Sequence, residues 1–121
     1  MNILNLTQHA ATADQIAAGV FEPADKSDVQ RLLTFDTLPT REEVFARARA
    51  LAEVAKRHGA SRAMIGGAPF FMSPLERVLM RSEVQPDHAF AQRVSVEEPD
   101  GQGGVRKTQI FRHLGFIGAF E

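Results

Sequence analysis

The sequence predicts an α/β fold with a mixed sheet, and three observations lead to this prediction. Short apolar runs at residues 2–8 and 62–65 have the length of buried strands. Segments with helical spacing separate these runs, which is the order expected when parallel strands are joined by helices. Two alternating runs on either side of a glycine-rich turn then predict an antiparallel hairpin in the last third of the sequence.

Capping signals mark the helices in the first half of the chain. A Thr followed three residues later by Gln or Glu can satisfy free amides at a helix start, and this pair occurs at Thr12 and at Thr40. Apolar residues at helical spacing follow each pair, and a glycine ends each helix. We expect a strand at residues 2–8 and then three helices, at residues 13–18, within residues 20–39, and between Thr40 and Gly59.

The second half predicts a strand, a glycine loop, a helix and the hairpin. A third capping pair, Ser73 with Glu76, and Pro74 at the favoured first position place the helix start at Ser73. Pro86 should break the chain before the hairpin. Hairpin strands are expected at residues 88–97 and 105–113, followed by a short apolar segment at 114–120. This order describes a small Rossmann-like mixed sheet with a C-terminal antiparallel β-hairpin, in one domain over residues 1–121.

Composition excludes several classes of protein. The 121 residues are 44% hydrophobic and 24% charged, which is typical of an ordinary globular protein. The net charge of −1 does not suggest binding to duplex nucleic acid. Absence of cysteine excludes disulfides, thiolate nucleophiles and the usual structural zinc sites, and no His pair has metal-ligand spacing, so we expect neither metal nor cofactor.

The first residues and the small size suggest a location and an assembly. The apolar run at residues 2–6 has no basic flank and is too short to cross a bilayer, so we expect neither a signal peptide nor a membrane anchor, and a cytoplasmic protein. A small chain with a hairpin leaves strand edges exposed, and another copy can cover them. We therefore expect a homo-oligomer.

Ligands in open α/β sheets bind beyond the carboxyl ends of the strands. Two segments of this sequence directly follow predicted strands and are therefore candidates for such a site. Thr7, Gln8 and His9 end the first strand and offer a hydroxyl, an amide and an imidazole to a base, ribose or phosphate. Gly66 and Gly67 follow the next strand, and their backbone lets an anion approach the helix that follows. A merely tight strand-to-helix connection is the alternative interpretation of the glycine pair.

Three further residues are candidates. Phe70 offers an aromatic surface for stacking on a base, or for packing in a core or dimer interface. Arg112 and His113 end the second hairpin strand, and an arginine fork suits a phosphate, although a plain surface charge is the alternative. If the protein is an enzyme, His9 or His113 is the candidate acid or base.

The segment from Ile3 to Gln15, with His9, Thr12 and Gln15 evenly spaced after the first strand, resembles the start of a known group of proteins. These are small Rossmann-like accessory proteins of cyclic-nucleotide defence signalling, which include CRISPR-associated ring nucleases and phage proteins that sequester such signals. The resemblance implies a homodimer in which two copies build a pocket for a cyclic oligonucleotide or a related signalling nucleotide.

These observations lead to one functional hypothesis and two alternatives. The hypothesis is a protein that binds and sequesters a signalling nucleotide at the strand ends, as a phage or prophage counter-defence protein would. The first alternative is a metal-independent ring nuclease or phosphodiesterase that acts on the same ligand. The second is an inhibitor that contacts a partner protein through Phe70 and Phe71 and binds no small molecule.

Overall fold

The computed structural model describes residues 2–118 and contains a five-stranded mixed sheet with four helices. The elements in chain order are β1 (Ile3–Leu6), α1 (Ala13–Ala17), β2 (Val20–Phe21), α2 (Lys26–Leu33), α3 (Arg41–Arg57), β3 (Arg62–Ile65), α4 (Pro69–Arg81), β4 (Gln85–Pro99) and β5 (Val105–Gly118). None of the described helices is long and apolar enough to cross a bilayer.

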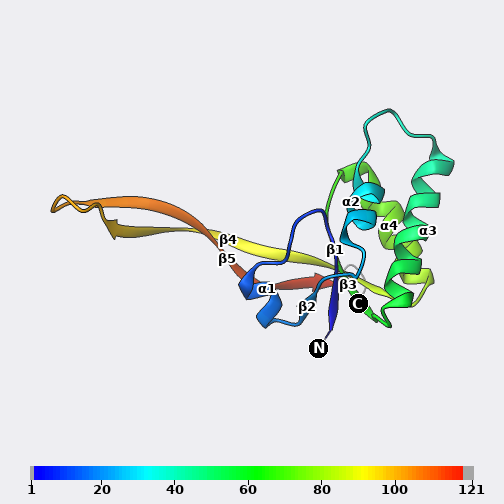
Figure 1. The fold of residues 1–121 in the computed structure, drawn as a ribbon, viewed down its shortest axis with the longest axis horizontal. Coiled ribbons are helices and arrows are strands. Elements are labelled where there is room, and N and C mark those ends of the chain that lie inside the picture. Colours follow the sequence, from blue (N-terminus) through cyan, green and yellow to red (C-terminus); the bar gives the residue numbers. More distant parts are fainter. Residues whose placement is uncertain (1, 119–121) are drawn as a thin grey trace.

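The strand order is β2-β1-β3-β4-β5, with β1 between its two parallel neighbours. Strand β4 is parallel to β3, and β5 runs antiparallel to β4 at the edge. The predicted mixed sheet with a C-terminal hairpin is therefore confirmed. Helices α2, α3 and α4 lie on one side of the sheet and α1 lies on the other (Figure 1).

The two sides of the sheet bury very different amounts of apolar surface. Leu4, Leu6 and Ile65 point to the side of the three helices and belong to the main core. On the other side, a small cluster of Ile3, Val20 and Met64 is covered by Ala11 and Phe116. Successive residues of a strand face opposite sides, so the short strands serve both cores.

Side-chain hydrogen bonds cap the N-termini of the three helices in the first half of the chain. Thr12 forms the complete capping box at α1, Asp25 accepts from the Asp28 amide at α2, and the Thr40 hydroxyl accepts from the Glu43 amide at α3. Strand β2 was not predicted, because a run of two residues is too short to show alternation.

The predicted start of α4 was wrong. The helix begins at Pro69, one turn before Ser73, and Pro74 lies inside it. Phe71 explains the difference, because it stands four residues before Leu75 and is completely buried, so the apolar face of the helix begins there. Phe70 and Phe71 are consequently helical residues and not part of a loop.

The hairpin is longer than predicted. Strand β4 includes Pro86, which does not interrupt the chain, and β5 continues without a break to Gly118; residues 119–120 of the expected apolar segment lie outside the described residues. Leu114 forms a bulge, since Phe90 pairs with Gly115 and Ala91 with His113. The two strands extend from the body as a long ribbon, called the arm below (residues 90–115) (Figure 1).

We predict that the two residues proposed as N-caps respond differently to alanine. Thr40→Ala should lower the free energy of unfolding by about 1 kcal/mol, because the Glu43 amide loses its acceptor. Ser73→Ala should be neutral or slightly stabilising, because Ser73 is exposed inside α4 and alanine favours a helix. Urea denaturation of both variants measures this, and equal losses would contradict the helix start at Pro69.

Candidate functional site

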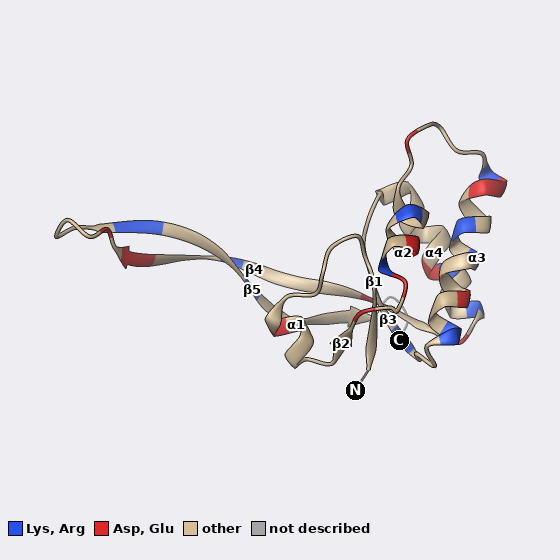
Figure 2. Cartoon of the chain, in the orientation of Figure 1, with Lys and Arg blue, Asp and Glu red and all other residues tan. Residues whose placement is uncertain are grey.

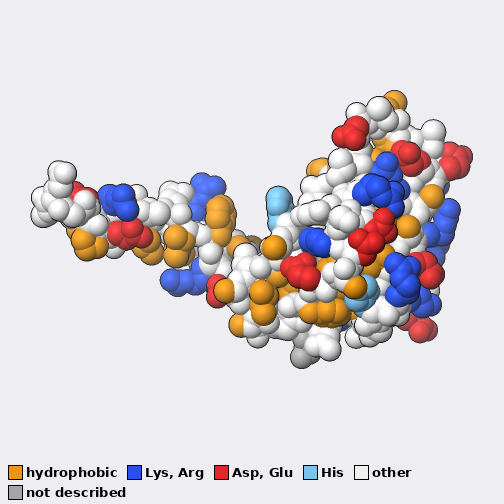
Figure 3. Space-filling model, viewed as in Figure 1, with side chains coloured by type: hydrophobic (Ala, Val, Ile, Leu, Met, Phe, Trp, Pro, Cys, Tyr) orange, Lys and Arg blue, Asp and Glu red, His pale blue; other side chains and the backbone are white. Residues whose placement is uncertain are grey.

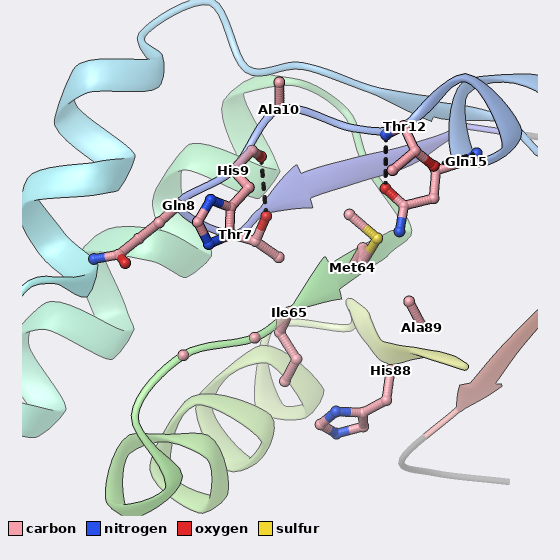
Figure 4. Close-up of a pocket in the computed structure, with 12 residues that line it drawn as sticks. Thr7, Gln8, His9, Ala10, Thr12, Gln15, Met64, Ile65, His88 and Ala89 are labelled. Atoms are coloured by element: carbon pink, nitrogen blue, oxygen red, sulfur yellow. Dashed lines mark hydrogen bonds between the residues drawn. The ribbon is translucent and has the colours of Figure 1, made fainter. Parts of the chain in front are cut away.

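A cavity of about 360 Å³ opens at the carboxyl ends of β1 and β3 (Figure 4). Five of the predicted site residues line it: Thr7, Gln8, His9, Gly66 and Gly67. These residues come together because β1 and β3 are parallel neighbours, so the loops after the two strands meet at one edge of the sheet. Strand β4 adds His88 and Ala89 to the wall.

The loop after β1 is held by the side chain of Asn5, which is completely buried in β1. Its Nδ2 donates to the His9 carbonyl at 2.8 Å and to the Glu22 carboxylate at 3.1 Å. Its Oδ1 accepts from the Thr7 amide at 3.0 Å and from the Thr7 hydroxyl at 2.6 Å. The amide therefore uses both of its ends to fix the loop.

Lys26 places a positive charge against the same loop. Its Nζ donates to the carbonyls of Thr7 at 2.6 Å and His9 at 3.0 Å, and forms an ion pair with Glu22 at 3.2 Å. Both loop carbonyls are thus occupied by Lys26. The charge of the ammonium group is offset by that of the Glu22 carboxylate, so the pair holds the loop and adds little net charge to it.

Glu22 completes the support of the loop. Burial by itself raises the pKa of Glu22, but hydrogen bonds from the Ala11 amide and from Asn5, together with the charge of Lys26, outweigh burial and lower the pKa below 4.5. The bond from the Ala11 amide is 2.7 Å long. The carboxylate therefore holds Ala11 directly, and it holds the Thr7 end of the loop through Asn5 and Lys26.

Gln8 and Thr7 are less free than the sequence suggested. The Gln8 side chain donates to the Thr34 hydroxyl at 2.8 Å and extends away from the other labelled residues of its loop (Figure 4). The Thr7 hydroxyl donates within the loop, so its oxygen is left as an acceptor. His9 is exposed, and among these three residues it offers the least committed side chain.

The glycine loop leads directly into α4. Gly67 has a φ of +149°, which side chains rarely adopt, whereas Gly66 has ordinary backbone geometry. Within the described part of the chain, no hydrogen bond uses the amides of Gly67 and Ala68. These amides precede a helix of 13 residues, whose start carries partial positive charge.

His88 and Glu76 form a pair that was not predicted from the sequence. The imidazole Nε2 of His88 lies 2.6 Å from Oε2 of Glu76 on α4, and His88 lines the cavity. A carboxylate that accepts from one ring nitrogen orients the ring and leaves the other nitrogen for a ligand. The only sequence signal was a His at the start of a predicted strand, and the packing of α4 on β4 supplies its partner.

Three predicted residues do not line the cavity. Phe70 packs on Phe35, with ring centroids 5.0 Å apart, and stays half exposed. Arg112 is exposed on the arm, opposite Gln92. The His113 ring lies 4.8 Å from that of Phe116, and both of its nitrogens are buried without a hydrogen-bond partner among the described residues. Arg112 and His113 therefore lie outside the cavity that the other five predicted residues line.

No group of three or more His, Asp or Glu side chains within residues 2–118 is arranged to hold a metal ion. The polar side chains that line the cavity include the imidazoles of His9 and His88, the hydroxyls of Thr7 and Thr12, and the amide of Gln15. Such groups recognise anions and the polar edges of small molecules.

We predict that Glu22→Gln destabilises the protein in a pH-dependent way. The carboxylate has a lowered pKa in the folded state, so its contribution is present above pH 4.5 and is lost as the pH falls through the folded pKa. Urea denaturation of the wild type and the variant should therefore show a larger difference at pH 7 than at pH 3. A difference that stays constant with pH would refute the role of the charge.

No curated protein and no solved structure is similar enough to this chain to be matched. One family model does match, over residues 1–117, and its description is the Uncharacterized protein MJ1673 family. Because the match spans almost the whole sequence, the chain belongs to the MJ1673 family.

Proposed function

We propose that this protein binds a signalling nucleotide through a phosphate group in the cavity at the ends of β1 and β3. The observation that carries the proposal is that Gly67, which lies just before α4, lines the same cavity as His9 and His88. Free amides at a helix start are a common way to hold a phosphate.

The electrostatics of the cavity support an anionic ligand. The imidazoles of His9 and His88 can donate hydrogen bonds to an anion. The carboxylates nearby are engaged: Glu22 by Asn5 and Lys26, and Glu76 by His88. A phosphate would therefore meet donors on several sides.

The size of the cavity supports a single nucleotide unit. A volume of about 360 Å³ is at the lower end of the range of small-molecule sites, so a cyclic oligonucleotide would place one unit inside and leave the rest of the ring outside. The resemblance of residues 3–15 to proteins of cyclic-nucleotide defence signalling supports a signalling nucleotide as the ligand. Sequestering it would remove the signal, as counter-defence requires.

A second candidate function is the metal-independent cleavage of the same ligand, and the His88–Glu76 pair favours it. In such a reaction a ribose 2′-hydroxyl attacks the neighbouring phosphorus and the bond to the 5′ oxygen breaks, which gives a 2′,3′-cyclic phosphate. His88 would accept the hydroxyl proton, and His9 would return a proton to the leaving oxygen. No metal and no co-reactant are needed.

We predict that a ligand found by a thermal-shift screen of cyclic dinucleotides, cyclic oligonucleotides and nicotinamide-derived nucleotides will bind Gly66→Ala more weakly. A ligand at a hundred times its Kd should stabilise the wild type by about 2.7 kcal/mol. The added methyl group meets only Thr7 Cγ2, at 3.5 Å, and should leave the unliganded melting temperature nearly unchanged. Gly67 is a poorer test, because its φ makes any side chain destabilising.

Arg49→Ala is the matched control, because Arg49 is exposed on α3 and does not line the cavity. It should change neither affinity nor melting temperature. No shift with any nucleotide would refute the proposal and would favour contact with a partner protein instead.

We predict that His88→Ala distinguishes a protein that only binds the ligand from one that cleaves it. The ligand is incubated with excess wild-type protein, released by denaturation and identified by mass spectrometry. A 2′,3′-cyclic phosphate product that is lost in His88→Ala and strongly reduced in Glu76→Gln, with binding retained, would establish catalysis by this pair. Intact ligand after incubation with the wild type would exclude the enzyme and leave the binding protein.

A further inference from the structure

We infer that the arm is a dimerisation element that pairs antiparallel with the arm of a second copy of the chain. The inference concerns a surface outside the cavity and does not depend on nucleotide binding. It starts from the isolation of the two strands: β3 pairs with β4 only through Arg62, Ala63 and Met64, so beyond Asp87 the strands β4 and β5 have only each other.

A ribbon of two strands is marginal in water on its own. Three or more strands, or packing against a helix, are normally needed for independent stability. The described helices gather at the body and leave the arm uncovered on both faces (Figure 1). Both outer edges of the arm therefore present unpaired backbone groups to a partner.

Apolar side chains along the arm are the second observation. Phe90, Val94 and Val96 alternate along one face of β4, and Ile110 pairs with Val94 on the same face. Phe90 is 50% exposed and Ile110 is 40% exposed. Figure 3 shows hydrophobic side chains along the arm, interspersed with charged ones. Such a stripe indicates a surface that another protein covers.

The two ends of the arm complement each other. Near the body, a hollow of about 260 Å³ is lined by Phe90, Leu114, Gly115, Phe116 and Ile117. Val96 is the last apolar residue of the stripe before the turn, and it lies on the same face as Phe90. In an antiparallel pair of arms, Val96 of each copy reaches the hollow around Phe90 of the other. This is the reciprocity that a twofold axis imposes.

Charges along the arm fit the same arrangement. Arg93 and Arg112 lie in the half near the body, whereas the half near the turn carries Glu97, Glu98 and Asp100 against Arg106 and Lys107 (Figure 2). An antiparallel copy sets the basic half of one arm against the acidic excess of the other. Positive and negative charges are nearly balanced on the arm, so it does not select a polyanion such as nucleic acid.

The first test is the mass in solution, measured by size-exclusion chromatography with light scattering at 10 and 100 µM. The wild type should have twice the chain mass of 13.3 kDa. Val94→Glu places a charge in the apolar stripe and should give a monomer. The matched control is Ser95→Glu, on the opposite face of the same strand, which should stay a dimer. A monomeric wild type, or the same result for both variants, would overturn the inference.

The second test uses the absence of cysteine from the chain, so that a single introduced thiol reports only on itself. With Phe90 of each copy against Val96 of the other, Val94→Cys lies about one residue from the proposed twofold axis and should form a disulfide-linked dimer under mild oxidation. Val105→Cys should not, because Val105 lies opposite Pro99, about six residues at 3.3 Å from the axis, which puts the two copies of it roughly 40 Å apart. A linked dimer at residue 105 but not at 94 would show that the arms do not run antiparallel.

Discussion

The side chain of Asn5 is the interaction on which the candidate site depends. A buried amide is costly unless all of its polar groups are paired, and Asn5 pairs them with the loop that forms one wall of the cavity. Glu22 and Lys26 add the charges that keep this loop in place. The wall is thus organised before a ligand arrives, which reduces the entropy lost on binding.

The cavity and the arm share one strand. Strand β4 contributes His88 to the cavity wall and continues two residues later into the arm. The buried carboxylate of Asp87 anchors this junction through two bonds of 2.7 Å from Arg62, and through Gln85 at 2.8 Å. A movement of the arm would therefore be transmitted to His88 more directly than to the loop after β1.

The part of the site that could be predicted followed from strand order alone. Thr7 and Gly66 needed only the rule that parallel strands end at the same edge. His88 could not be predicted in this way, because its partner Glu76 comes from the packing of a helix on a strand. The place of Arg112 was missed because alternation shows that a hairpin exists, but not how far it extends from the body. The start of α4 was missed because a strong capping pattern at Ser73 masked the burial of Phe71.

The position of β1 between β2 and β3 has a consequence during synthesis. Strand β3, one of its two partners, begins more than fifty residues later in the chain. At translation rates of 5 to 20 residues per second, roughly 3 to 10 seconds pass between the synthesis of β1 and that of β3. During this interval β2 is the only strand partner of β1 that has been synthesised. For that interval the nascent chain exposes the apolar strand Ile3–Leu6, and this is the stage at which a chaperone would have most to bind.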